Sequence, residues 1–150
     1  MHDPYVINEP RVDEIAHRLE QIPLFTGCYP EDILAIARRC EVRDVARGEY
    51  LILGGALGDE FFVLLSGRAR RGGDGESARE LGPGDYFGEL ALLDPAPRSK
   101  DVVALDDCTV AVLSGANFRV LLVAAPGVAP RLLASLARRL RTAEIGHDGH

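Results

Sequence analysis

The chain of 150 residues has no tryptophan and few other aromatic residues, and it has a single methionine. It also lacks any stretch approaching the roughly 18 consecutive apolar residues of a membrane-spanning helix, so no membrane insertion is expected. Its start, from Met1 to Pro4, has neither a basic segment nor an apolar run behind it, which argues against a signal peptide. The sequence therefore predicts a cytoplasmic protein.

Histidine is absent between His17 and His147, and only three cysteines are present. A metal-dependent β-roll enzyme of the cupin type needs histidines on its strands, so that class is excluded. The thiols of Cys28, Cys40 and Cys108 form no CxxC pair, and free cysteines in a reducing compartment are expected. No Gly-x-Ser-x-Gly elbow or other nucleophile with a neighbouring base appears. We therefore predict no enzyme activity, no catalytic residue, no metal and no cofactor.

An excess of positive charge is also lacking, since 23 acidic residues outnumber 17 basic ones and the net charge is −6. Domains that bind duplex DNA usually carry a basic patch, so this chain is expected not to bind nucleic acid directly. Lys100 is the only lysine, and all other basic side chains are arginines. The length and the ordinary apolar content suit one globular domain.

Apolar residues recur at helical spacing near both ends of the chain, and short strand-like stretches fill the middle. Helices are expected over 10–22, 30–39, 114–122 and 126–143, with the arginines of the last helix on a solvated face. Between them, glycine-rich breaks separate seven candidate strands, 41–46, 49–53, 60–66, 67–71, 78–81, 101–105 and 108–113. This spacing predicts a sandwich or barrel. The domain is expected to span 10–143, with a flexible lead-in at 1–9 and a flexible tail at 144–150.

The segment from Phe87 to Ser99 interrupts the predicted β body with one short helical turn. Gly88 allows close backbone approach, and the turn that follows presents unpaired N–H groups, as an anion site does. Arg98 can give a phosphate two parallel donors, whereas the carboxylate of Glu89 suits a sugar hydroxyl. From residue types alone, a structural ion pair between Glu89 and Arg98 that only pins the loop is the favoured interpretation.

The same segment resembles the phosphate-binding cassette of the cyclic nucleotide-binding domain family, and the likeness extends over roughly residues 12–143. The turn motifs that flank the cassette follow the family's order as well. The matching positions are Ile22-Pro23-Leu24-Phe25, Gly48-Glu49, Gly58-Asp59, Ser66-Gly67, Gly82-Pro83-Gly84-Asp85, Phe87 to Leu93, Pro97, Arg98 and Val102.

The resemblance implies an α+β fold, an antiparallel eight-stranded β-roll with N-terminal helices, a cassette helix and C-terminal lid helices. It implies a sensor that binds a cyclic nucleotide, with cAMP favoured over cGMP. Glu89 and Gly88 would hold the ribose. The phosphate would be held by Arg98, Ser99 and the backbone at Leu90 and Ala91. The helix over 126–143 would cover the base and report occupancy to an effector domain or a second copy.

Two residues depart from the family pattern, because Lys100-Asp101 follows Ser99 where Ala-Thr is usual. Lys100 would add positive charge near the phosphate, whereas Asp101 would repel it or pair with Lys100 or Arg98. Strand alternation predicts that the two side chains do not both face the pocket. Two alternatives remain open at this point. The chain is either a degenerate member that serves as a docking or dimerisation module, or an excerpt of a larger effector such as a channel, a hydrolase or a transcription factor. About ten residues follow Leu140, too few for a helix-turn-helix.

Overall fold

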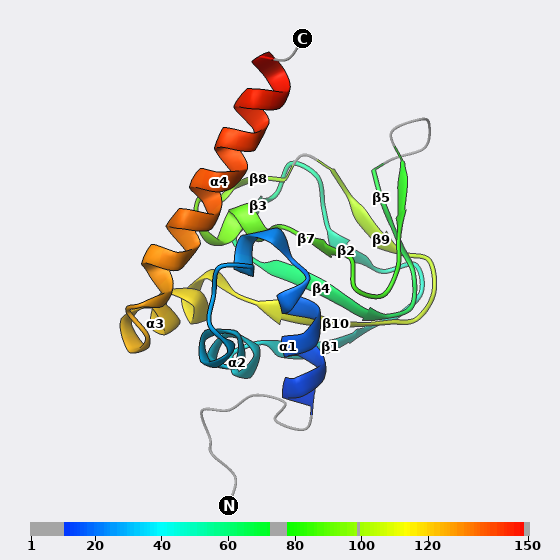
Figure 1. Ribbon diagram of the computed structural model, residues 1–150. Helices are drawn as coiled ribbons and strands as arrows, with labels where there is room; N and C mark the ends of the chain where they lie inside the picture. The colour runs from blue at the N-terminus through cyan, green and yellow to red at the C-terminus, as the bar shows by residue number, and fades with distance from the viewer. Residues whose placement is uncertain (1–10, 73–77, 99, 149–150) are drawn as a thin grey trace, which may run out of the picture.

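The computed structural model describes residues 11–72, 78–98 and 100–148. Helices lie at both ends of the chain and a β body lies between them (Figure 1). The predicted lead-in at 1–9 falls outside the described residues, as does Ser99. The fold is therefore α+β, as the sequence predicts.

The N-terminal helical layer consists of α1 (Val12–Glu20), the short 3-10 helix η2 (Pro23–Phe25) and α2 (Pro30–Arg38). Pro30 occupies the first turn of α2, where its missing N–H costs nothing. The Asp32 carboxylate caps the same helix by accepting from the Tyr29 N–H at 2.9 Å. The apolar faces of these helices pack on one side of the β body.

The β body contains antiparallel strands in two four-stranded sheets and one two-stranded pair, counted over the described ranges. The first sheet has the order β1 (Glu41–Val45), β10 (Cys108–Leu113), β4 (Phe61–Ser66), β7 (Tyr86–Phe87). The second has the order β2 (Tyr50–Ile52), β9 (Val102–Ala104), β5 (Ala69–Arg71), β6 (Arg79–Leu81). The pair is β3 (Leu57–Gly58) with β8 (Ala96–Pro97). The two larger sheets supply the expected eight strands of the roll.

The strand β4 divides the hydrophobic core, because both of its faces are buried. Phe61, Val63 and Leu65 face the helices, whereas Phe62 and Leu64 face the interior of the roll. A continuous apolar run is the pattern that a strand covered on both faces requires. The two core clusters hold the helical layer and the roll together as one body.

Two helices follow the β body, α3 (Gly115–Ala124) and α4 (Val128–Asp148). Ser114 caps α3, since its Oγ accepts from the Asn117 N–H at 3.1 Å. The helix α4 rises along one flank of the body and extends above it (Figure 1). Its backbone continues to Asp148, beyond the boundary at 143 that the sequence predicts.

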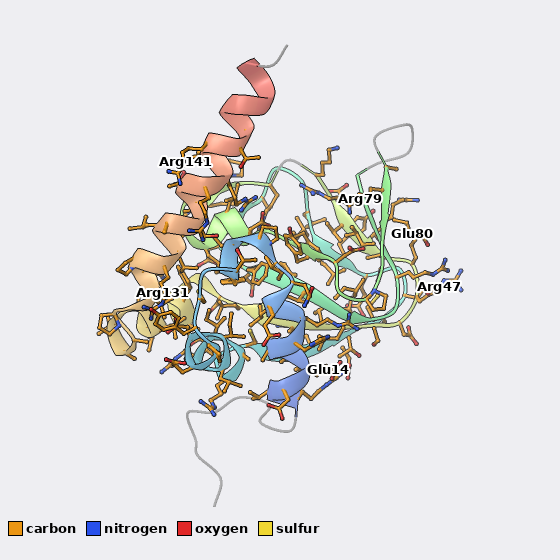
Figure 2. The ribbon with its side chains drawn as sticks, viewed as in Figure 1. Glu14, Arg47, Arg79, Glu80, Arg131 and Arg141 are labelled. Carbon is orange, nitrogen blue, oxygen red and sulfur yellow. The ribbon has the colours of Figure 1, made fainter. Side chains whose placement is uncertain are left out.

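The prediction of a solvated arginine face on α4 is wrong for Arg131. This side chain forms a bidentate ion pair with the buried Asp32, with its Nε 2.6 Å and its Nη2 3.0 Å from the carboxylate oxygens. Its guanidinium also lies 4.1 Å from the ring centre of Tyr29, and Figure 2 shows it at the base of α4 beside α2. The pair joins the two helical layers across 99 positions of sequence.

The described ranges contain no single helix that is long and apolar enough to cross a membrane. The three cysteines are free, as the sequence predicts.

Candidate functional site

The predicted cassette folds as a short 3-10 helix, η3 (Glu89–Leu92), entered from β7. Phe87 anchors the entry, because it is buried and stacks on Phe62 with ring centres 5.0 Å apart. Gly88 then turns the backbone with φ +84°, a left-handed conformation that favours glycine. A Cβ there would lie 2.6 Å from the Glu60 carbonyl oxygen, so both conformation and space require glycine.

The side chain of Arg98 is held in a seat formed by two glycines. Its Nη2 donates to the Glu60 carbonyl oxygen at 2.6 Å. A Cβ on Gly58 would overlap the guanidinium, and one on Gly88 would lie 2.8 Å from Nη1. Burial lowers the pKa of Arg98, and the negative charges of Glu60 and Asp59 partly offset that effect. A guanidinium partly shielded from water in this way interacts more strongly with an anion than a fully solvated one.

The backbone of Arg98 is fixed by hydrogen bonds to the segment that follows β2. The Arg98 N–H donates to the Ala56 carbonyl oxygen at 2.8 Å, and its carbonyl oxygen accepts from the Gly55 N–H at 2.7 Å. The β3–β8 pairing at Leu57 and Pro97 continues the same ladder. Arg98 is therefore placed by the sheet as well as by its side-chain contacts.

The carboxylate of Glu89 faces the C-terminal helix. Its Oε1 lies 3.8 Å from Nη2 of Arg139 on α4, and its side chain is only 16% exposed. Among the residues that the structure describes, Glu89 and Arg98 form no ion pair with each other. The alternative of a structural ion pair across the cassette is therefore not what the structure contains.

One cavity of about 510 Å³ receives almost all of the predicted site residues. Those that line it are Gly88, Glu89, Leu90, Ala91, Arg98 and Lys100. Asp101 does not, because its Oδ1 accepts from the Gly54 N–H at 2.6 Å on the other side of the strand. Ser99 lies outside the described residues. A cation and a carboxylate thus lie in one enclosure with the start of η3 between them.

Four further charged side chains, which are not among the predicted site residues, also line the cavity. They are Arg71, Arg79, Asp85 and Asp94. The alternation of β5 and β6 carried the signal for the two arginines, since Ala69 and Leu81 on the same strands must face inward. Burial raises the pKa of the Tyr86 phenol in this cavity, with a further contribution from the negative charge of Glu89.

The described residues offer neither a metal site nor a reactive thiol. No group of three or more His, Cys, Asp or Glu in these ranges has the geometry to hold a metal ion. Burial raises the pKa of the Cys28 thiol to about 11 and that of Cys40 to about 12, so both are protonated at neutral pH. The groups that line the cavity are suited to binding a small anion that also carries hydroxyls.

Comparison with known proteins identifies relatives of the whole arrangement. Residues 42–124 match the family model described as "Cyclic nucleotide-binding domain". The cyclic AMP receptor protein of Thermus thermophilus is 35% identical over 131 residues, which are 84% of this chain and 61% of that protein. The cAMP-dependent protein kinase regulatory subunit of Emericella nidulans is 40% identical over 106 residues, 69% of this chain and 26% of the subunit.

A solved structure supports the same assignment. The N-terminal domain of a transcriptional regulator from Streptomyces coelicolor superposes with a TM-score of 0.77 at 30% identity, covering 87% of this chain and 94% of that domain. The chain spans about three fifths of the length of the bacterial regulators that it matches.

Proposed function

Because the chain belongs to the cyclic nucleotide-binding domain family, we propose that it binds cAMP reversibly, in preference to cGMP, and performs no chemistry on it. The observation that carries this proposal is the shared cavity of about 510 Å³, which Glu89 and Arg98 both line. The names of the relatives support cAMP as the nucleotide, since they are a cyclic AMP receptor and cAMP-dependent kinase subunits. The protein would act as a cytoplasmic regulatory domain.

The two charged residues would divide the ligand between them. Glu89, together with the preceding Gly88, would hold the ribose, and its carboxylate would accept a hydrogen bond from the ribose hydroxyl. Arg98 would donate two parallel N–H hydrogen bonds to the cyclic phosphate. Ser99 and the backbone at Leu90 and Ala91 would complete the phosphate site. The Ala91 N–H already donates to the Gly88 carbonyl oxygen at 3.1 Å, so it would share its hydrogen between that oxygen and the ligand.

The contact between Glu89 and Arg139 offers a route by which occupancy reaches α4. A ribose hydroxyl that donates to Glu89 would compete with Arg139, whose Nη2 is 3.8 Å from the carboxylate. The base of the same helix is held by the Arg131–Asp32 pair and by the Ser135 hydroxyl, which donates to the Pro23 carbonyl oxygen at 2.7 Å. We infer that ligand binding changes the contacts and the position of α4 around Arg139, while the part of the helix that contains Arg131 and Ser135 stays in place.

The outer face of α4 suits a second copy of the chain. Leu133 and Leu140 are 64% and 65% exposed, and their spacing of one heptad places them on one stripe of the helix. Self-association along this stripe would bring two α4 helices together and couple their responses. Such a pair, or an effector attached through α4, would be the element that the nucleotide regulates.

Calorimetric titration with cAMP and with cGMP tests the proposal. We expect one site per chain, with cAMP the tighter ligand, and slower hydrogen exchange in α4 once the site is filled. Absence of heat and of thermal stabilisation at millimolar nucleotide would overturn the sensor function, and the chain would then be interpreted as a docking module. Unchanged exchange in α4 despite binding would overturn only its role in transmission.

A further inference from the structure

The β5–β6 hairpin brings two arginines into the cavity. Arg71 and Arg79 are directly opposite each other in the register of the two strands, so their side chains leave the same face of the sheet. Two positions along, the pair Ala69 and Leu81 is buried in the interior of the roll. Strand alternation therefore places both arginines on the same face as that buried pair. Both line the cavity and remain exposed to solvent. Figure 2 shows Arg79 on this hairpin.

A third cation, Lys100, lies just before the neighbouring strand β9. Arg71 is also directly opposite Val102 on β9, and Lys100 precedes Val102 by two positions. Lys100 lines the same cavity, whereas the intervening Asp101 bonds to the Gly54 N–H outside it. Arg71 and Arg79 come from β5 and β6, and Lys100 comes from the segment that leads into β9. All three are distinct from Arg98, which packs against Gly58 and Gly88.

The described residues do not supply these three side chains with an ion-pair partner. Like charges directly opposite on neighbouring strands destabilise a sheet. Two of the carboxylates that line the cavity are engaged elsewhere, since Glu89 faces Arg139 and Asp85 accepts from the Gly82 N–H at 2.8 Å. The third is Asp94, which follows η3. This end of the cavity therefore presents hydrogen-bond donors and positive charge.

We propose that Arg71, Arg79 and Lys100 form a second anion site, and that the ligand which fills the whole cavity is a nucleotide with two phosphates. One phosphate lies against Arg98, and this step rests on the function proposed above. The second lies between Arg71 and Arg79, whose guanidinium groups match phosphate oxygens in fork geometry. A volume of about 510 Å³ is within the range of pockets that enclose ligands of such size.

The test compares three probes on the purified chain at one fixed low ionic strength, because salt screens these contacts. The probes are cAMP, 3′,5′-linked cyclic diadenosine monophosphate and inorganic pyrophosphate. The variants are Arg71→Gln/Arg79→Gln, Arg98→Gln and the control Arg38→Gln, which removes charge from an exposed helix end away from the cavity. Calorimetry gives the affinities, and thermal shifts report pyrophosphate.

We expect the wild type to bind the dinucleotide at least about tenfold more tightly than cAMP, the effect of one or more charge-assisted hydrogen bonds. The double variant should lose this advantage and most of the pyrophosphate shift, and it should lose more affinity for the dinucleotide than for cAMP. Arg98→Gln should weaken both nucleotides and keep the pyrophosphate shift. The control should leave all three values unchanged.

Equal affinity of the wild type for the dinucleotide and cAMP, or equal losses for both in the double variant, would overturn the second site. A pyrophosphate shift in the double variant as large as that of the wild type would do the same, because Arg71 and Arg79 would then contribute nothing to binding the anion. Absence of cAMP binding with a pyrophosphate shift that depends on Arg71 and Arg79 would overturn the proposed function and support the anion site.

Discussion

Nη2 of Arg139 lies 3.8 Å from Oε1 of Glu89, so the carboxylate assigned to the ribose already faces a cation from α4. This contact links the cassette to the helix that closes the domain. In the proposed function the ligand hydroxyl and the guanidinium compete for one carboxylate. Variants of Arg139 should therefore change both the affinity for cAMP and the response of α4 to the ligand.

Replacing Arg139 by Gln should raise the affinity for cAMP by about two- to fivefold. The ligand would no longer have to break a partly exposed ion pair, which contributes roughly 0.5–1 kcal/mol. The same variant should show a smaller change in α4 hydrogen exchange when ligand is added. Calorimetry and exchange on the same samples check both points. A fall in affinity would mean that Arg139 supports the ligand and does not compete with it.

Arg98→Ala should cost about 2–5 kcal/mol of cAMP binding, because it removes one partner of a desolvated charge contact. Arg98→Lys should recover only part of this, as a single ammonium cannot donate two parallel bonds. Circular dichroism and the thermal midpoint establish that each variant is folded. Wild-type affinity in Arg98→Ala would remove this residue from the site.

Gly58→Ala should displace the guanidinium of Arg98, since the new Cβ would overlap it. We expect cAMP affinity to fall by at least about tenfold, with a much smaller effect on the thermal midpoint. Gly82→Ala is the matched control, because a Cβ there meets nothing within 4 Å. Equal effects of the two substitutions on binding would show that the seat of Arg98 has no role in recognition.

The Asp32–Arg131 pair predicts a pH dependence of stability. The hydrogen bond from Arg131 holds the pKa of Asp32 below its usual range. The pair therefore stabilises the fold above the ordinary aspartate pKa of about 4, and this contribution is lost as the pH falls through the lowered value. Asp32→Asn should lower the free energy of unfolding at pH 7 by about 2 kcal/mol.

Chemical denaturation between pH 7 and pH 3 measures the effect. The difference between wild type and Asp32→Asn should shrink as the pH falls. A difference that stays constant over this range would mean that the charge on Asp32 contributes nothing. Asn keeps a side-chain oxygen for the Tyr29 N–H, so the comparison isolates the ion pair from the helix cap.

The helices and the longer strands were predictable from the sequence, because their apolar residues repeat over enough positions to define a period. The strands over 57–58, 86–87 and 96–97 were not, since two residues cannot show alternation. They form only when distant segments meet, since β3 pairs with β8 and β7 pairs with β4. The short helix after Gly88 was predictable from glycine and proline placement.

The composition of the site was predictable only in part. The cassette residues are contiguous, so one motif indicated them together. Arg71 and Arg79 join the cavity only through strand register, and Arg131 reaches Asp32 from 99 positions away. Alternation along β5 and β6 indicates which face each arginine shares with Ala69 or Leu81, but not that the two arginines lie side by side. The separation of 99 positions between Asp32 and Arg131 leaves no local pattern at all.

The proposed function depends most on where a cyclic nucleotide binds, and a crystal structure of the chain grown with cAMP measures this directly. We predict the ribose hydroxyl within hydrogen-bond distance of Glu89 and the cyclic phosphate within that distance of Arg98, both inside the cavity. A nucleotide bound elsewhere, or one that leaves either residue in its present contacts, would contradict the account.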